Sequence, residues 1–288
     1  MNGIIILNKP LGYTSRDIVN IVGKYFNTRK VGHTGTLDPN ASGVIVLCVG
    51  KALKICELLM DHDKEYIAEI ILGIKTDTLD TDLNASILED VNVNIEDDKI
   101  KTVVNSFAGK YMQEIPIYSA VKVNGRKLYE YARNNISVDL PKKEVEIKDI
   151  ELLSDIKHEN GKVIFKIKTT VSKGTYIRGL VRDIGNKLGY PAVMNSLVRT
   201  KLGKFDIEDA NSLDDIKNGN YKLYKITDVL DNIPVIKVDD NNAFKIKNGV
   251  SIDKLFNDNM SFIVDKYNNL LALYKNDDGK CRPYKMFV

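Results

Sequence analysis

The first half of the chain combines short apolar runs with one helical pattern. Residues 3–7 and 44–49 are unbroken apolar runs, which predict two buried strands. Between them, apolar residues recur at helical spacing as far as about Phe26, and Thr14 or Ser15 can cap the start of that helix. Residues 31–43, rich in Gly, Thr, Asp and Pro, predict a loop. A short helix over 52–60 and a strand over 66–72 are expected next.

The middle of the chain alternates between helical and strand patterns. Residues 97–107 carry apolar positions on one helical face, and 127–133 predict a short basic and aromatic helix. From 163 to 171 every second residue is apolar or Thr, which predicts a strand with one wet face. A helix over 175–188 should end at Gly189, ahead of Pro191.

The pattern changes near residues 231–234. Beyond that break, short strands are predicted at 235–238, 262–264 and 270–274, separated by turns of Asn, Asp and Gly. We therefore expect two domains, 1–230 and 231–288, the second a β-rich module that depends on the first for stability.

Composition narrows the class of protein. The 288 residues are 43% hydrophobic, enough for a sizeable core, but no apolar run approaches the roughly 20 residues of a membrane span. The N-terminus lacks the basic and apolar regions of a signal peptide, so we expect a soluble cytoplasmic protein. The three cysteines have no C-x-x-C spacing and the three histidines no ligand spacing, so buried free thiols and no metal are expected.

Charge is unevenly distributed along the chain. Residues 161–204 hold ten Lys or Arg against one acid, whereas 61–104 hold twelve acids against four lysines. A concentrated basic segment is typical of a protein with a polyanionic partner, but a solvated face of alternating charge gives the same count. Charge alone therefore permits RNA binding without establishing it.

The segment 32–43, GHTGTLDPNASG, holds the most distinctive candidate chemistry. Its three glycines allow tight turns and close approach of a ligand, and Asp38 precedes a proline that favours an extended backbone. Taken alone, Asp-Pro indicates a turn. No phosphate-binding loop is present, because Gly50-Lys51 is followed by Ala52 and no glycine stands at position 45. A dinucleotide fingerprint is also missing.

This segment closely resembles the catalytic motif of the TruB-type tRNA pseudouridine synthases. The resemblance covers residues 1–205 through further motifs in the same order: LNKP at 7–10, KEY at 64–66, TDTLD at 76–80, QEIP at 113–116, YSAVK at 118–122, GRKLYEYAR at 125–133, SKGTYIR at 172–178 and LVRT at 197–200. The C-terminal module resembles the small PUA-like RNA-binding domain of the same family, with KNG at 247–249 and RPYK at 282–285.

The resemblance implies a fold and a reaction. The fold is a mixed α/β (α+β) catalytic domain with a largely antiparallel central sheet, followed by the PUA-like module. The reaction turns the uridine at position 55 in the tRNA T-loop into pseudouridine without a cofactor. Asp38 is the implied nucleophile, and whether it attacks the base or the sugar stays open. Arg178 matches the arginine that pairs with it, and Tyr66 the tyrosine that packs on the uracil and is a candidate base.

Further residues are implied to contact the RNA. His33 matches a histidine that inserts near the position vacated by the flipped base. Tyr176 and Leu197 would form apolar walls, and Asp80 is either a polar contact or a turn residue. Six cations would bind phosphates and position the RNA: Lys9, Lys122, Arg126, Lys127, Arg133 and Lys173.

Two alternatives predict different behaviour. A guide-RNA-dependent synthase subunit resembles this chain around Asp38 but usually carries a longer C-terminal module and basic extensions. A tRNA-binding or tRNA-folding protein would need base turning without chemistry. We expect a T-loop tRNA substrate, no guide RNA, no membrane association and, by resemblance only, a monomer.

Overall fold

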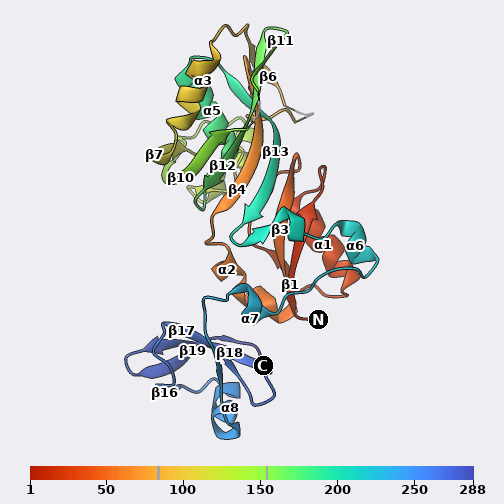
Figure 1. The fold of residues 1–288 in the computed structure, drawn as a ribbon, viewed down its shortest axis with the longest axis vertical. Helices are drawn as coiled ribbons and strands as arrows, with labels where there is room; N and C mark the ends of the chain where they lie inside the picture. The colour runs from red at the N-terminus through yellow and green to blue at the C-terminus, as the bar shows by residue number, and fades with distance from the viewer. Residues whose placement is uncertain (83–84, 154) are drawn as a thin grey trace.

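A large twisted sheet forms the centre of the molecule in the computed structural model, which describes residues 1–82, 85–153 and 155–288 (Figure 1). Its main strands follow the order β1 (Gly3–Lys9), β3 (Ala41–Val49), β13 (Ala192–Leu202), β4 (Lys64–Leu72), β12 (Lys162–Val171), β10 (Lys142–Leu152) and β7 (Gly109–Glu114). Three short strands extend it: β2 (Val31–His33) on β3, β11 (Lys157–Glu159) on β12 and β14 (Phe205–Asp206) on β13. Only β3 and β13 pair in parallel among these, so the predicted mixed, largely antiparallel sheet is confirmed.

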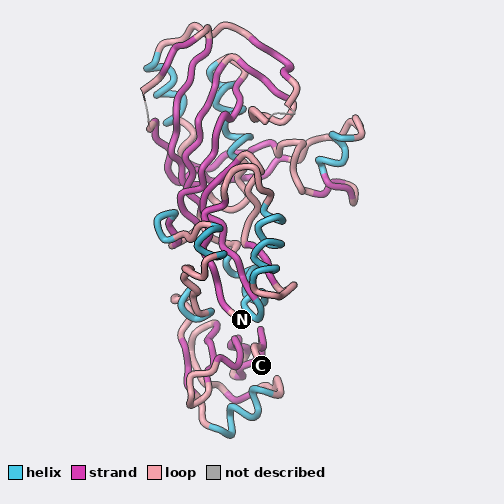
Figure 2. The backbone as a smooth tube through the Cα atoms, turned by 90° about the vertical axis from the view of Figure 1, so that its right-hand side faces the viewer, coloured by secondary structure: helices cyan, strands magenta, loops and turns pink. Residues whose placement is uncertain are grey.

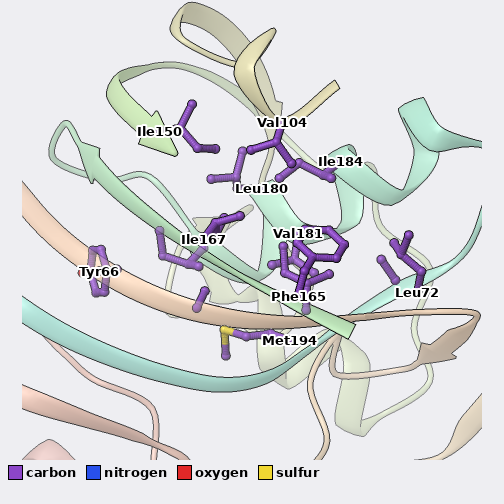
Figure 3. Packing of buried hydrophobic residues seen from close by; sticks show 14 of the residues in the cluster. Tyr66, Leu72, Val104, Ile150, Phe165, Ile167, Leu180, Val181, Ile184 and Met194 are labelled. Carbon is purple, nitrogen blue, oxygen red and sulfur yellow. The ribbon is translucent and has the colours of Figure 1, made fainter. Parts of the chain in front are cut away.

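The half of the sheet built on β4 and β12 is covered on one face. Buried residues alternate along both strands, as the pattern at 163–171 predicted. Helices α3 (Asp97–Asn105) and α5 (Ile177–Leu188) pack on the apolar side, where Phe165, Leu180 and Val181 lie in one core (Figure 3). The other side of these strands carries the polar residues.

The half built on β1 and β3 is buried on both faces, which accounts for its continuous apolar runs. Helices α1 (Ser15–Tyr25) and α6 (Leu213–Lys217) cover one face. The opposite face is covered by the 3₁₀ helix η1 (Gly50–Ile55), by α2 (Cys56–Leu59) and by α7 (Ile226–Val229). A second 3₁₀ helix, η2 (Ile207–Asp209), follows β14.

Several predicted boundaries were right and others were wrong. Thr14 caps α1 in a capping box with Asp17, and Gly189 ends α5 with a left-handed φ of 88°. Residues 31–33 and 41–43 are strand rather than the predicted loop. They pair with other strands, β2 with β3 and β3 with β13, and the local sequence pattern does not indicate such pairing. The helix expected over 52–60 divides into η1 and α2.

Two small ribbons leave the main sheet. One joins β5 (Ile74–Thr76) to β6 (Ile87–Asp90). The other joins β8 (Lys122–Val123) to β9 (Arg126–Lys127) and leads into α4 (Leu128–Arg133). Among the described residues, the strands of this second ribbon pair only with each other. We call residues 122–133 the arm, because the ribbon and its helix stand away from the main sheet (Figure 2).

The C-terminal segment forms a second sheet at one end of the long axis (Figure 1). Its order is β15 (Val235–Lys237), β17 (Met260–Val264), β18 (Leu270–Asp277), β19 (Lys280–Met286) and β16 (Ile252–Asp253). The predicted β-rich module is confirmed, although α8 (Asp240–Lys247), β16 and β19 were missed. The division at residue 231 stays a prediction.

A shared core joins the second sheet to the first. Phe262, Leu273 and Phe287 pack in the same buried cluster as Val229 and Leu230 beneath β1 and β3. At its edge, two residues of β19 meet Glu57 of α2. Lys285 forms an ion pair with the Glu57 carboxylate at 2.8 Å, and the Tyr284 hydroxyl donates to that carboxylate at 2.7 Å. The module is therefore docked through apolar burial rather than tethered by a bare linker. Within the described ranges, no helix combines the length and apolarity needed to span a bilayer.

Substitution of Phe262 by Ala should lower the free energy of unfolding by about 3–5 kcal/mol, because it leaves a cavity in this shared core. Urea denaturation followed by circular dichroism measures the change. Phe244→Ala is the matched control, since that ring lies in the same module and is 70% exposed. Equal losses in the two variants would contradict docking through the shared core.

Candidate active site

Asp38 lies in the connection from β2 to β3, and its loop is held by backbone contacts. The Leu37 amide donates to Ser15 Oγ at 2.9 Å, and Ser15 Oγ donates back to the Leu37 carbonyl at 3.2 Å. The Asp38 and Pro39 carbonyls accept from the amides of Ala41 and Gly12 at 3.0 and 2.9 Å. With its loop fixed on both sides, the Asp38 side chain stays 41% exposed and accessible to a ligand.

Arg178 meets Asp38 from the first turn of α5. Its Nε lies 2.9 Å from Asp38 Oδ2, while Nη1 and Nη2 donate to the carbonyls of Thr78 and Tyr118 at 2.9 and 3.1 Å. The guanidinium is therefore oriented by three separate segments, and Arg178 as a whole is only 8% exposed. Such a charge-assisted contact fixes the direction of the carboxylate. The structure thus brings together the two residues that the sequence paired.

Asp80 stands behind this pair and also shapes a turn. Its carboxylate accepts hydrogen bonds from Thr78 Oγ1 and from the Asp82 amide, and lies 4.0 Å from Arg178 Nε. Burial raises the pKa of Asp80, against the lowering effects of the Thr78 hydrogen bond and the Arg178 charge. Both roles considered for Asp80, as a turn residue and as a polar residue near the pocket, are compatible with this geometry.

A cavity of about 630 Å³ opens beside Asp38. Tyr66 and Leu197 line it from β4 and β13, and Tyr176 lines it from the residue before α5. Its size is within the range of small-ligand pockets, and its walls combine aromatic and aliphatic groups with one carboxylate–guanidinium pair. This is a suitable environment for a flat heterocyclic base.

Gln113 fixes the backbone that delivers Arg178 to the cavity. Its Nε2 donates to the Tyr176 carbonyl at 3.0 Å, and its Oε1 accepts from the Tyr176 amide at 2.8 Å. The side chain is almost fully buried in β7. This two-way contact holds the start of α5 against the sheet, a role that the motif QEIP alone did not reveal.

His33 lines the cavity from the end of β2. Its Nδ1 accepts from the Gly35 amide at 3.3 Å, so the neutral ring carries its proton on Nε2. Burial lowers the pKa of His33, and the positive charges of Arg16 and Arg199 lower it further. The ring therefore stays neutral around pH 7, which suits insertion among bases.

Five of the six cations expected to bind phosphate are exposed or half-buried, and the sixth, Lys9, is buried. Lys122, Arg126 and Arg133 are exposed on the arm, Lys127 is half-buried there, and Lys173 is exposed before α5 and pairs with Asp61 at 3.3 Å. Tyr129 connects the arm with the cavity, since it lines the cavity and lies about 5 Å from the Lys127 and Arg133 head groups.

Lys9 is placed differently from the other cations. Its side chain is fully buried, and Nζ donates to the carbonyls of Pro10 and Tyr13 at 2.9 and 2.7 Å. Burial lowers the pKa of Lys9 to about 8. The ammonium supports the turn beside the Asp38 loop and is not presented to solvent, so the RNA contacts proposed below do not include it.

Arg199 is a residue whose position the sequence analysis did not foresee. It is 1% exposed on β13, and its Nε donates to the Val44 carbonyl at 2.6 Å. Longer contacts at 3.4 Å join its two terminal nitrogens to the carbonyls of Thr36 and Gly35. This guanidinium therefore supports the loop that carries Asp38. The LVRT motif marked the residue, but an arginine in a strand gives no local sign that it is buried.

The described residues hold no group of three or more His, Cys, Asp or Glu side chains placed to bind a metal ion. The arrangement offers a fixed, accessible carboxylate, a buried guanidinium and a neutral imidazole around one cavity. Those groups can provide a carboxylate nucleophile and orient a planar ring beside it.

Family comparisons agree with this geometry. Residues 23–177 match the TruB family pseudouridylate synthase (N terminal domain) model, and 178–233 match the tRNA pseudouridylate synthase B C-terminal domain model. The chain belongs to the TruB family of pseudouridylate synthases. TruB-family membership makes it an isomerase.

Curated TruB relatives are similar over most of their length. The chain is 43% identical to tRNA pseudouridine synthase B of Bacillus subtilis, with 88% of this chain and 84% of that protein covered. It is 39% identical to the Staphylococcus aureus protein of the same name, with 99% of each covered.

Solved structures share the fold. A chain from "Structure of H/ACA RNP bound to a substrate RNA containing 2'-deoxyuridine" has a TM-score of 0.69 at 23% identity, covering 99% of this chain and 85% of that one. A chain from "Crystal Structure of a Cbf5-Nop10-Gar1 Complex" has a TM-score of 0.68 at 25% identity with the same coverage.

Arg199→Met should slow the isomerisation step by about 10²-fold, because the loop carrying Asp38 loses its support and a shift of about 1 Å at a reacting group has that effect. Single-turnover rates at saturating enzyme measure it. Lys201→Met on the same strand is the control, since its head group is exposed beside Asp206. A wild-type rate in Arg199→Met would contradict a positioning role for Arg199.

Proposed function

We propose that this enzyme converts the uridine at position 55 of the tRNA T-loop into pseudouridine, with Asp38 as nucleophile. The observation that supports this most strongly is the Asp38–Arg178 pair at the mouth of a base-sized cavity. The tRNA substrate is supported by the name of the curated relatives, tRNA pseudouridine synthase B, at about 40% identity.

The proposed reaction rearranges one nucleotide with no net gain or loss of atoms. The C1′–N1 bond breaks, the uracil turns, and C1′ joins C5. C5 then loses its proton and N1 gains one. The Asp38 carboxylate adds either to the base or to C1′ and leaves again later, which requires that it be ionised at the start. Arg178 pairs with the carboxylate and orients it, and Tyr66 on the cavity wall is the candidate base for the C5 proton.

The target uridine must leave the T-loop stack to reach Asp38, at a cost of a few kcal/mol. Tyr66, Tyr176 and Leu197 offer stacking and apolar contact to the flipped uracil. His33, neutral and at the rim of the cavity, is placed to fill the space that the base vacates. Together these contacts offset part of the unstacking cost.

Phosphate contacts would come from the arm and from Lys173. Lys122, Arg126, Lys127 and Arg133 lie on β8, β9 and α4, beyond the cavity wall formed by Tyr129. Such contacts position an RNA without reading its sequence. Shape and a splayed-out base are the usual means of recognising an RNA loop. The C-terminal module would add a further RNA-binding surface.

We propose that the enzyme works in the cytoplasm as a monomer and acts on naked tRNA. The H/ACA RNP and Cbf5-Nop10-Gar1 chains that share the fold are 23–25% identical to this chain, whereas the tRNA pseudouridine synthase B relatives are about 40% identical. A protein that folds tRNA without chemistry would not need the oriented Asp38–Arg178 pair.

Incubation of purified protein with a tRNA transcript, without cofactor, metal or guide RNA, should yield pseudouridine at the T-loop uridine. Mapping at single-nucleotide resolution locates the product. Asp38→Asn should abolish it while leaving tRNA binding in place, because the amide keeps the shape but lacks the nucleophilic charge. Product from Asp38→Asn would refute the nucleophile. Bound but unmodified tRNA with wild type would favour the guide-dependent or folding protein instead.

A further inference from the structure

A second hollow lies beside the catalytic cavity, along the outer face of α1. It encloses about 600 Å³ between the helix and the segment 27–31 that follows it. Arg16, Asn20 and Lys24 line it from the helix, and Asn27 and Arg29 from the segment. The three helical residues are spaced four apart, so they form one stripe along one face. We call this hollow the α1 groove.

The wall of the α1 groove opposite the helix is an ordered segment. The Asn27 amide donates to the Lys24 carbonyl at 3.1 Å, and the Thr28 amide donates to the Gly23 carbonyl at 2.9 Å. Thr28 Oγ1 then accepts from the Lys30 amide at 3.2 Å. Gly23 permits this close return, because a Cβ there would lie 2.8 Å from the Thr28 carbonyl oxygen. Arg29 is thus presented from a fixed backbone.

The charge of the α1 groove is one-sided. Its described lining holds three cations and no carboxylate. All three side chains are exposed, and none forms an ion pair within the parts of the chain that the structure describes. The adjacent acid, Asp17, is turned to the helix start, where it accepts from the Thr14 amide and hydroxyl at 2.9 and 2.6 Å. The groove therefore carries unneutralised positive charge, which would attract a polyanion.

The α1 groove adjoins the cavity beside Asp38 at Arg16. Arg16 lines both hollows, and its charge helps to lower the pKa of His33 at the cavity rim. Arg16 and Lys24 are eight residues apart on one helix, so they span about 12 Å at 1.5 Å per residue. That length is enough to follow several consecutive phosphates of one strand.

We propose that the α1 groove binds the phosphate backbone of the tRNA strand that leaves the catalytic cavity on the His33 side. This inference rests on the proposed function and specifies where the substrate extends beyond the flipped base. Arg16, Lys24 and Arg29 provide the charge, and Asn20 and Asn27 provide neutral donors between them. The contacts are to phosphate, so they add affinity without sequence preference.

The test is the affinity of the full-length protein for unmodified tRNA as a function of salt. In the double variant Lys24→Gln, Arg29→Gln, which spares the cavity lining, the slope of log Kd against log salt should fall by about 2, roughly one unit per lost phosphate contact. Binding at 0.1 M salt should weaken by about 10-fold or more. Adding Arg16→Gln should lower the slope further. Lys99→Gln, Lys157→Gln removes the same charge from exposed positions that line neither hollow, and should keep the wild-type slope.

An unchanged Kd and slope in the groove variant, or an equal change in the charge-matched control, would overturn the α1 groove as a binding surface. Circular dichroism melting of each variant confirms that the comparison is between folded proteins. Pseudouridine mapping on the same tRNA keeps the two proposals apart. If wild-type protein forms no pseudouridine in the T-loop, the proposed function is contradicted. If the groove variant keeps the wild-type salt slope, only the proposal that the α1 groove binds tRNA is contradicted.

Discussion

The site depends on one constraint: each nitrogen of the buried Arg178 guanidinium must have a hydrogen-bond acceptor while the group faces Asp38. An arginine carries five N–H donors in a rigid plane and cannot shed its charge when buried. Here Asp38 takes the Nε side, and the carbonyls of Thr78 and Tyr118 take the terminal nitrogens. Four segments distant in sequence must therefore meet at one point, and much of the fold serves that meeting.

The sheet brings these segments together. The parallel pairing of β3 with β13 places the Asp38 loop above Arg199, and the antiparallel pairing of β13 with β4 places Tyr66 opposite Arg199. Gln113 of β7 holds the backbone at the start of α5, and this places Arg178 in the wall of the cavity beside Asp38. Several buried polar side chains near Asp38 fix backbone in this way, as expected where unpaired burial would be costly: Gln113, Arg178, Arg199 and Lys9. The result is a carboxylate that is positioned before RNA arrives.

The amount that could be predicted from sequence differs between fold and site. Continuous runs in β1 and β3 and alternation in β12 follow directly from burial on two faces or one, so pattern alone located them. The α8 helix was missed because its Asn- and Asp-rich start looks like a loop and only two of its residues are buried. Asp38, as an Asp-Pro dipeptide, would have been a turn without the family motif. The burial of Lys9 and Arg199 was not predictable, because it depends on carbonyls that the folded backbone presents: those of the turn after Lys9, and that of Val44 on another strand.

Single-turnover kinetics of Arg178→Lys at saturating enzyme, with tRNA affinity measured alongside, test whether the guanidinium of Arg178 prepares Asp38 for the reaction. A lysine keeps the charge but cannot make the planar set of contacts to Asp38, Thr78 and Tyr118. We expect a rate of pseudouridine formation lower by about 10²-fold or more, with tRNA affinity retained. A wild-type rate in Arg178→Lys would show that the geometry of the guanidinium is not what prepares Asp38.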